Sequence, residues 1–328
     1  MKYRILGKTG FEISEVSLGT WQVGGKWGED FDRDNAEKII NTALDNGINF
    51  IDTADVYSDG ESEAAIGRVL KGRSEKIYVA SKCGRKISPH SNEEYTPKRL
   101  RDLVENSLRN MQLEQLDLIQ LHCPPTDVYY RPEIFAEFDK MKQEGKIANL
   151  GVSVEKVEEA IKAMEYPNVA TVQIIFNMFR QRPADKFFKM AKANNVGIIA
   201  RVPLASGLLS GKFSRDTTFS ENDHRNFNRE GKAFDKGETF AGIDYETGLK
   251  AVEELKKELS EIYSLPQYAL KWILMFNEVS TIIPGASKPD QVISNIKASD
   301  IPLLTREQMH RVNAIYENRF KEQVHQRW

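Results

Sequence analysis

The 328-residue sequence lacks several features that mark common protein classes. It has only two cysteines, Cys83 and Cys123, which gives no disulfide framework, and they lie too far apart in sequence to suggest a metal pair. No hydrophobic run approaches the length of a membrane span, and the first residues lack the apolar core of a signal peptide. We therefore expect a protein of the reducing cytoplasm that has no metal centre.

An excess of charge of one sign is also missing. Lys and Arg together number 46 against 48 Asp and Glu, which gives a formal net charge of −2. This balance offers no electrostatic reason to expect nucleic acid or a membrane surface as a partner. It leaves the oligomeric state open.

What the sequence does contain is a regular alternation of strand and helix patterns. Apolar runs predict about eight strands, at residues 16–19, 48–52, 77–82, 116–121, 147–152, 170–174, 197–200 and 280–283. Helical patterns occupy residues 35–46, 61–70, 97–111, 133–144, 155–164 and 185–194, and later 248–263, 266–276 and 304–319. A hairpin is expected over residues 3–13, around a Gly-containing turn.

This alternation favours a parallel sheet that is covered by helices. The number of strands and the length fit a closed (β/α)8 barrel of the TIM type, with residues 1–328 as one domain. An open, doubly wound sheet is the alternative. It is weakened because the Gly-x-Gly-x-x-Gly phosphate turn follows none of the expected strands.

Four polar side chains fall where these strands end. Asp52 ends the strand at 48–52, Lys82 ends the strand at 77–82, and His122 follows the strand at 116–121. Tyr57 lies on the loop after Asp52. Each of them alone has a structural explanation, such as loop packing or a solvated strand end. Active sites of (β/α) barrels are built at this rim, so the four together indicate a catalytic site.

Several motifs, in combination and order, resemble those of the aldo-keto reductase superfamily. They are LGKTGFEISEVSLGTW, DTADVYSDGESEAAIG, VASKCG, LIQLHCPP, GVS and IPGASKPDQVISNI, and they span nearly the whole chain. The resemblance implies a barrel that binds a nicotinamide cofactor without a Rossmann motif and reduces aldehydes and ketones. It also implies that Asp52, Tyr57, Lys82 and His122 form the catalytic tetrad.

The residue types suit this chemistry. Hydride must come from the cofactor, while the developing alkoxide needs a proton. Tyr57 would supply that proton as general acid, helped by the Lys82 ammonium, which we expect to lower the tyrosine pKa. Asp52 would be the counter-ion of Lys82. A neutral His122 would hydrogen-bond and orient the carbonyl oxygen.

The resemblance further implies which residues bind NADPH or NADH. Ser153 and Gln173 resemble the ligands of the nicotinamide carboxamide, although the residue after that serine is commonly Asn and here is Val154. Arg201 falls where many relatives have a stacking aromatic ring, and a planar guanidinium can also stack. A salt-bridged arginine at a strand end is the alternative. The full predicted set is Thr20, Trp21, Asp52, Ser153, Gln173, Arg201, Pro203, Leu204, Ser206, Gly207, Lys212, Arg225, Gly285, Ser287, Lys288, Gln291 and Asn295.

Two regions of the chain that contain residues of this set are expected to bind the phosphate groups of the cofactor. PLASGLLSGK (203–212) resembles the loop that clasps the pyrophosphate, and the long stretch 213–242 after it is expected to be a lid, with Arg225 or Arg229 near phosphate. A flexible insertion is the alternative. Ser287 and Lys288 stand at the start of a helix and would bind the ribose phosphate of NADPH, so we expect NADPH to be preferred over NADH.

The predicted function is therefore NAD(P)H-dependent carbonyl reduction of a small molecule. A redox-sensing regulatory subunit with slow turnover is the main alternative, since the superfamily includes potassium-channel β subunits. A barrel lyase or isomerase is a weaker one. We expect Trp21, Trp27, Tyr129 and Tyr130 to line an apolar substrate pocket, and the tail to Trp328 to cover its mouth.

Overall fold

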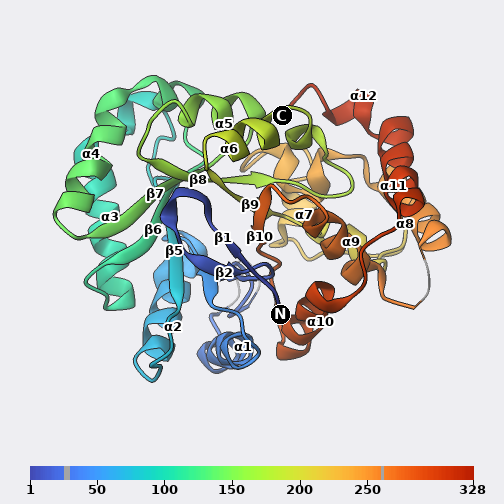
Figure 1. Ribbon diagram of the computed structural model, residues 1–328, viewed down its shortest axis with the longest axis horizontal. Coiled ribbons are helices and arrows are strands. Elements are labelled where there is room, and N and C mark those ends of the chain that lie inside the picture. Colours follow the sequence, from blue (N-terminus) through green and yellow to red (C-terminus); the bar gives the residue numbers. More distant parts are fainter. Residues whose placement is uncertain (26–29, 260–261) are drawn as a thin grey trace.

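The computed structural model describes residues 1–25, 30–259 and 262–328. Within these residues, eight parallel strands form one sheet in chain order from β3 to β10 (Figure 1). They are β3 (Leu18–Gly19), β4 (Phe50–Asp52), β5 (Tyr78–Cys83), β6 (Leu116–His122), β7 (Ile147–Ser153), β8 (Val169–Ile175), β9 (Gly197–Arg201) and β10 (Val279–Ile282).

The first and last strands of this sheet meet and close it. Val16 pairs with Ile282 and Gly19 pairs with Gly285, both in parallel orientation. The approach is tight at Gly19, where an added Cβ would lie 2.7 Å from the carbonyl oxygen of Ile283. Glycine at this position therefore permits the closure, and the predicted (β/α)8 barrel is confirmed.

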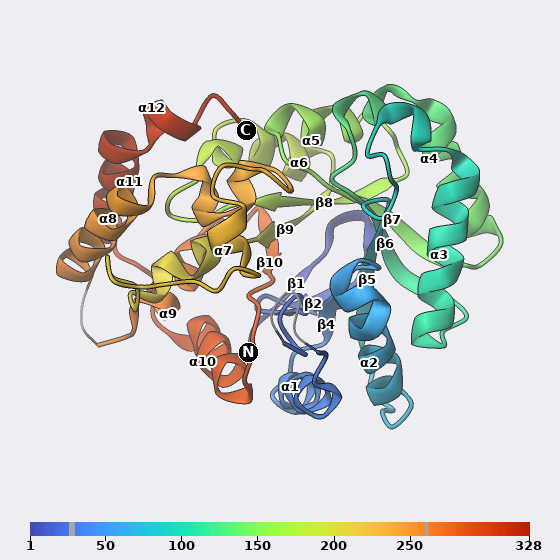
Figure 2. The same cartoon turned by 180° about the vertical axis from the view of Figure 1, so that it is seen from behind.

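Helices surround the barrel in Figures 1 and 2. Their amphipathic sequences place apolar side chains against the strands, as in α1, where Ile39, Ile40 and Leu44 are buried. The helices are α1 (Arg33–Asp45), α2 (Glu61–Leu70), α3 (Pro97–Met111), α4 (Pro132–Gln143), α5 (Val157–Ala163), α6 (Phe187–Ala193), α7 (His224–Phe227), α8 (Tyr245–Glu258), α9 (Leu265–Leu274), α10 (Pro289–Asp300), α11 (Arg306–Arg319) and α12 (Lys321–Val324). No helix in the described part of the chain is long and apolar enough to cross a membrane.

The alternation of side chains along the strands separates two apolar cores. Phe50, Ala80 and Leu118 belong to a cluster inside the barrel. Their sequence neighbours, such as Ile51 and Ile119, pack in the larger cluster under the helices. The inner cluster also contains Leu6 and Ile13, from the hairpin of β1 (Tyr3–Ile5) and β2 (Glu12–Ser14). The hairpin therefore closes one end of the barrel.

Residues 213–242 lie over the opposite end (Figures 1 and 2). This segment contains α7 and two short 3₁₀ turns, Lys236–Glu238 and Phe240–Gly242. Asn228, Glu238 and Thr239 within it are buried, so it is packed on the barrel and is not a loose insertion.

Several predicted helices differ from the observed ones by one or two residues at an end, and the helix expected over 248–263 differs most. The helix expected over 248–263 is observed as α8 and ends at Glu258. Residues 260 and 261 of that prediction lie outside the described residues.

Candidate active site

The carboxylate of Asp52, the last residue of β4, is the centre of a buried polar cluster at the open end of the barrel. Lys82 Nζ lies 2.5 Å from Asp52 Oδ1, and both side chains are almost fully buried. The other carboxylate oxygen accepts hydrogen bonds from Gln120 Nε2 at 3.0 Å and Gln173 Nε2 at 2.8 Å. Asp52 therefore supplies the counter-charge that a buried ammonium requires.

Tyr57 joins this cluster through Lys82. Besides the bond to Asp52, Lys82 Nζ donates to the carbonyl oxygen of Thr53 at 2.8 Å and to the hydroxyl oxygen of Tyr57 at 3.2 Å. An ammonium has three donors, so all of them are used. The position of Lys82 is thereby fixed relative to the tyrosine hydroxyl.

Burial raises the pKa of Tyr57, although the charge of Lys82 acts in the opposite direction. The net direction differs from the lowering expected from the sequence, because the cavity walls enclose the phenol. Burial also acts to lower the pKa of Lys82, but the charges of Asp52 and Tyr57 outweigh it and the pKa is raised. At neutral pH the tyrosine thus keeps its proton and the lysine its positive charge.

His122, the last residue of β6, completes the predicted group of four. Its ring meets the Tyr57 ring edge-on, with 6.1 Å between the centroids. Burial, then the charges of Arg85 and Lys82, lower the pKa of His122 well below its usual value, so the imidazole is neutral. Its Nδ1 atom is buried and has no hydrogen-bond partner among the described residues.

Asp52, Tyr57 and His122 line a cavity of about 980 Å³, counting the part that opens to solvent, whereas Lys82 contacts the first two without lining it. One wall is aromatic. The Trp21 ring lies 6.3 Å from that of Tyr57 and 6.4 Å from that of Phe234, measured between centroids. The cavity is lined by Gly19, Thr20, Trp21, Gln22, Asp52, Val56, Tyr57, Arg85, His122, Gln173, Arg201, Val202, Pro203, Phe234, Glu238, Ile283 and Gly285.

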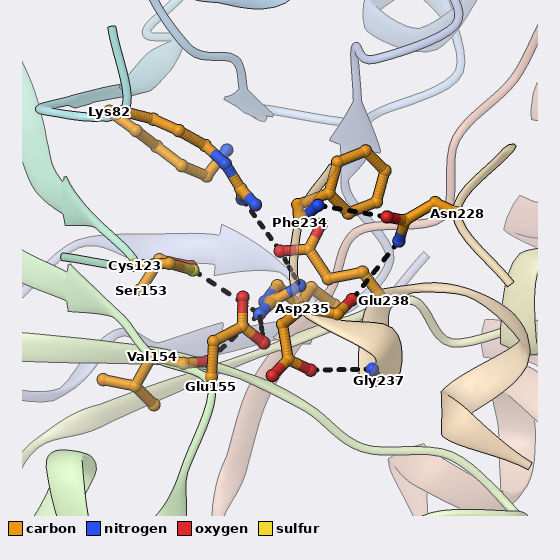
Figure 3. A network of polar contacts seen from close by, with 12 residues as sticks. Lys82, Cys123, Ser153, Val154, Glu155, Asn228, Phe234, Asp235, Gly237 and Glu238 are labelled. Atoms are coloured by element: carbon orange, nitrogen blue, oxygen red, sulfur yellow. Dashed lines mark hydrogen bonds and ion pairs between the residues drawn. The ribbon is translucent and has the colours of Figure 1, made fainter. Parts of the chain in front are cut away.

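Part of the cavity wall is charged and is built around Glu238, from the segment 213–242. Arg85 Nη1 donates to Glu238 Oε1 at 2.8 Å, and Arg201 Nη1 lies 3.6 Å from the same oxygen. Arg201 Nη2 also donates to Glu155 Oε2 at 3.0 Å. Figure 3 shows Glu155 and Glu238 reaching toward each other from the barrel and from the segment.

The pKa values of the two carboxyl groups of this wall are shifted in opposite directions. Burial and the carboxylate of Glu238, against the charge of Arg201, raise the pKa of Glu155 to about 8. Burial would also raise the pKa of Glu238, but Arg85 and Arg201 hold it well below its usual value. A protonated Glu155 facing an ionised Glu238 avoids two adjacent negative charges.

A cation site formed by Cys123, Glu155 and Glu238 is already filled by a guanidinium. One ligand atom of each lies within 4.8 Å of the others. Arg201 Nη2 lies 3.6 Å from Cys123 Sγ and 3.0 Å from Glu155 Oε2. The positive charge that a metal ion would bring is thus provided by Arg201.

A family model described as the aldo/keto reductase family matches residues 15–317. This chain belongs to the aldo/keto reductase family. It is therefore an oxidoreductase of a family that reduces carbonyl groups, and the resemblance seen in its motifs is confirmed.

Relatives match over nearly the whole chain. The chain is 30% identical over 334 residues to aldo-keto reductase YhdN of Bacillus subtilis, covering 99% of this chain and 96% of the relative. It is 28% identical over 323 residues to the NADH-specific methylglyoxal reductase of Escherichia coli, covering 92% and 95%. It is 30% identical over 337 residues to the putative voltage-gated potassium channel subunit beta of Schizosaccharomyces pombe, covering 95% and 92%.

Solved structures of the family have the same fold. The glycerol dehydrogenase AKR11B4 from Gluconobacter oxydans aligns with a TM-score of 0.76 at 34% identity, covering 97% of this chain and 95% of that one. The holo form of aldo-keto reductase AKR11C1 from Bacillus halodurans aligns with a TM-score of 0.78 at 26% identity, covering 99% of each.

The residues predicted to bind the cofactor fall into two groups in this aldo/keto reductase. Those that line the cavity are Thr20, Trp21, Asp52, Gln173, Arg201, Pro203 and Gly285. Those that do not line it are Ser153, Leu204, Ser206, Gly207, Lys212, Arg225, Ser287, Lys288, Gln291 and Asn295. Among the second group, Ser287 and Lys288 follow the cavity residue Gly285 at the start of α10, and Gln291 and Asn295 lie in that helix.

Two members of the second group lie where the 203–212 loop meets the segment 213–242. Ser206 Oγ donates to the carbonyl oxygen of Glu238 at 3.0 Å and accepts from the amide of Phe240 at 3.0 Å. Arg225 donates to Asp223 through Nε at 2.8 Å, and its guanidinium lies near Gly207 of the 203–212 loop. The predicted pyrophosphate loop and the predicted lid are therefore bonded to each other.

Two expectations about the substrate pocket are wrong, and a third concerns Trp27, which lies outside the described residues. Tyr129 is buried and donates to the carbonyl oxygen of Ser153 at 3.3 Å, while Tyr130 is 61% exposed, and neither lines the cavity. Trp328 does not line the cavity; its Nε1 donates to Asp235 Oδ1 at 2.8 Å on the segment 213–242. Trp27 lies outside the described residues.

Arg85, Phe234 and Glu238 line the cavity but were not predicted as site residues. Arg85 follows the VASKCG motif directly, and this position after a strand end was a usable signal. Phe234 and Glu238 lie within a stretch without periodicity, so no sequence pattern indicates which of its residues turn inward.

Proposed function

We propose that this protein reduces aldehydes and ketones to alcohols, using NADPH by preference and NADH as a second hydride donor, with Tyr57 as the general acid. One observation carries the proposal: Lys82 Nζ lies 2.5 Å from Asp52 Oδ1 and 3.2 Å from the hydroxyl of Tyr57, and both of these residues line the cavity. A tyrosine held against a buried, paired ammonium is a suitable proton donor. Membership of the aldo/keto reductase family supports the same reaction.

Each of the four side chains has a role in this proposal. A bound reduced nicotinamide supplies the hydride to the carbonyl carbon. Tyr57 gives its proton to the carbonyl oxygen as negative charge develops there, and the phenolate that remains is stabilised by Lys82. Asp52 keeps Lys82 charged. The neutral His122 hydrogen-bonds the same oxygen and so orients the carbonyl group.

The residues around the cavity fit a nicotinamide dinucleotide. The cavity runs from Tyr57 to Gly285, which is followed by the first turn of α10. A helix N-terminus favours phosphate through its amide groups and dipole. Lys288 there is exposed and has no acidic partner in the described part of the chain. We propose that Ser287 and Lys288 bind the ribose phosphate and that Arg201 lies against the nicotinamide ring.

The test is to incubate the purified protein with NADPH and a panel of aldehydes and ketones and to follow cofactor absorbance. We expect repeated turnover that depends on the carbonyl compound. No carbonyl-dependent consumption of NADPH or NADH with any member of the panel would contradict the proposal.

A nicotinamide-binding regulatory subunit is the second candidate. It is favoured by the 30% identity to the putative potassium channel subunit beta of Schizosaccharomyces pombe. This role predicts tight cofactor binding with oxidation in single turnovers that are too slow for a reductase. Pre-steady-state and steady-state rates with the same aldehyde separate the two functions.

A further inference from the structure

The cavity lining combines apolar and charged side chains. Trp21 and Phe234 contribute apolar surface to its lining, and Arg85 and Glu238 add a largely buried ion pair next to the Phe234 ring. A substrate with only a hydrocarbon chain cannot form a hydrogen bond with an ion pair beside the reacting carbonyl. Burying a guanidinium and a carboxylate at a substrate cavity is costly unless both make hydrogen bonds. The ion pair therefore points to a polar group in the substrate.

Arg85 is held in place by contacts on one part of its guanidinium. Nη1 donates to Glu238 Oε1 at 2.8 Å, and the group lies over the Phe234 ring, 5.4 Å from its centroid. Nε and Nη2 have no acceptor among the described residues, and neither atom is fully buried. The fixed guanidinium thus has free donors at a cavity that it lines with Tyr57 and His122.

We infer that Arg85 selects carbonyl substrates that carry a second oxygen atom, a hydroxyl or an oxo group, on the carbon next to the reacting carbonyl. The inference rests on the function proposed above. With the carbonyl oxygen held between Tyr57 and His122, the neighbouring oxygen accepts a hydrogen bond from the free donors of Arg85. Arg85 and His122 line the same cavity, and the charge of Arg85 helps to lower the pKa of His122.

The pairing of Arg85 with Glu238 favours a neutral oxygen over a carboxylate. Arg85 is already paired with Glu238, and Glu238 keeps its negative charge because Arg85 and Arg201 both stabilise it. A substrate carboxylate at Arg85 would lie close to this ionised side chain and be repelled. A hydroxyl or oxo group makes the hydrogen bond without that repulsion.

The experiment compares substrates that share one carbon skeleton. kcat/KM with NADPH is measured for 2-hydroxypropanal, methylglyoxal and propanal, with glyoxylate as a carboxylate probe. We expect the wild type to prefer the first two over propanal by about tenfold or more, the value of one hydrogen bond to a charged group. Arg85→Met removes the donors while keeping an apolar stem, and should lower this preference by about tenfold.

Lys86→Met is the matched control. Lys86 is the next residue and also a cation, but it pairs with Asp59 at 2.7 Å and does not line the cavity. Its replacement should leave the substrate preference as in the wild type. Glu238→Gln keeps the shape of the wall and removes the charge that anchors Arg85, so it should lower the preference even if Arg85→Met does not fold.

Three results would overturn the inference. They are a wild type that reduces propanal as well as 2-hydroxypropanal, an Arg85→Met variant that loses activity equally on all substrates, and an Arg85-dependent preference for glyoxylate. In each case carbonyl reduction itself stands, because NADPH is still consumed. A wild type that consumes no cofactor with any carbonyl compound would instead contradict the proposed function.

Discussion

The Nζ atom of Lys82 lies 3.2 Å from the hydroxyl oxygen of Tyr57, and 4.9 Å from the centroid of its ring. The ammonium is therefore positioned to stabilise the phenolate more than the phenol. Charge that appears only during the reaction is the charge that a preorganised group stabilises most effectively. The first two predictions follow from this contact.

Tyr57→Phe should abolish turnover while leaving the cofactor site intact, because the substitution removes only the hydroxyl group. General acid catalysis is worth about 10²- to 10⁴-fold, so we expect kcat to fall by that factor. The dissociation constant of NADPH, measured by fluorescence titration, should stay close to the wild-type value. A variant that retains more than half of its kcat would remove Tyr57 from the role of proton donor.

Lys82→Met should change the pH dependence of the reverse reaction, alcohol oxidation by NADP⁺. Tyr57 must then act as a base, so the rate rises with pH as the phenol loses its proton. Without the ammonium the pKa of Tyr57 rises further, and the rising limb should move to higher pH. The measurement is kcat/KM against pH. The same limb in variant and wild type would show that Lys82 has no influence on the tyrosine.

Asp55→Asn should stabilise the protein at alkaline pH. Burial and the neighbouring Glu63 raise the pKa of Asp55 to about 7, against about 4 in an unfolded chain. The native state therefore binds the proton more tightly, and the wild type loses stability as pH rises from about 4 through about 7, by on the order of a few kcal/mol. The variant lacks this loss.

Urea unfolding at pH 5 and pH 8 tests this prediction. The free energy of unfolding of the variant relative to the wild type should be larger at pH 8. Asp59→Asn is the control, because Asp59 is exposed and its pKa is lowered by Lys86. Equal differences at the two pH values would mean that Asp55 is ionised in the native protein.

Saturating NADPH should protect the segment 213–242 from trypsin. Arg229 and Lys232 are exposed, whereas Ser206 of the predicted pyrophosphate loop is bonded to Glu238 and Phe240 of the segment. Cofactor bound at that loop would hold the segment closed and slow cleavage. Glu238→Gln, which loses the ion pairs to the barrel, should be cleaved faster than the wild type. Cleavage rates that are independent of cofactor would contradict a lid function.

Lys288→Ala should weaken the preference for NADPH. Lys288 is the N-cap residue of α10, and a hydrogen bond to a charged group is worth about 1.5–3 kcal/mol. The ratio of the dissociation constants of NADH and NADPH should therefore fall about tenfold or more. Lys297→Ala, at the other end of the same helix, is the control. An unchanged ratio in Lys288→Ala would assign phosphate recognition to other residues, with Arg225 as the first to test.

The sequence by itself determined the barrel and the positions of Asp52, Lys82 and His122. Buried parallel strands are continuous apolar runs, and the polar residue that follows such a run lies at the open end of the barrel whatever the tertiary details. Tyr57 could be placed near them because it follows Asp52 on a short loop. These positions follow from local patterns of apolar and polar residues, which can be seen in the sequence.

Only the tertiary structure decided the charged wall. Arg85, Glu155, Arg201 and Glu238 come from separate parts of the chain and meet because the segment 213–242 folds back over the barrel. The same holds for Gln173, whose amide bonds to Asp52 from a distant strand. The expected shift in the pKa of Tyr57 also has the opposite direction in the structure. Burial by all the residues around the phenol raises this pKa more than the charge of the single residue Lys82 lowers it. Ion pairs and burial that involve distant segments of the chain leave no periodic pattern in the sequence. They could therefore be recognised only in the tertiary structure.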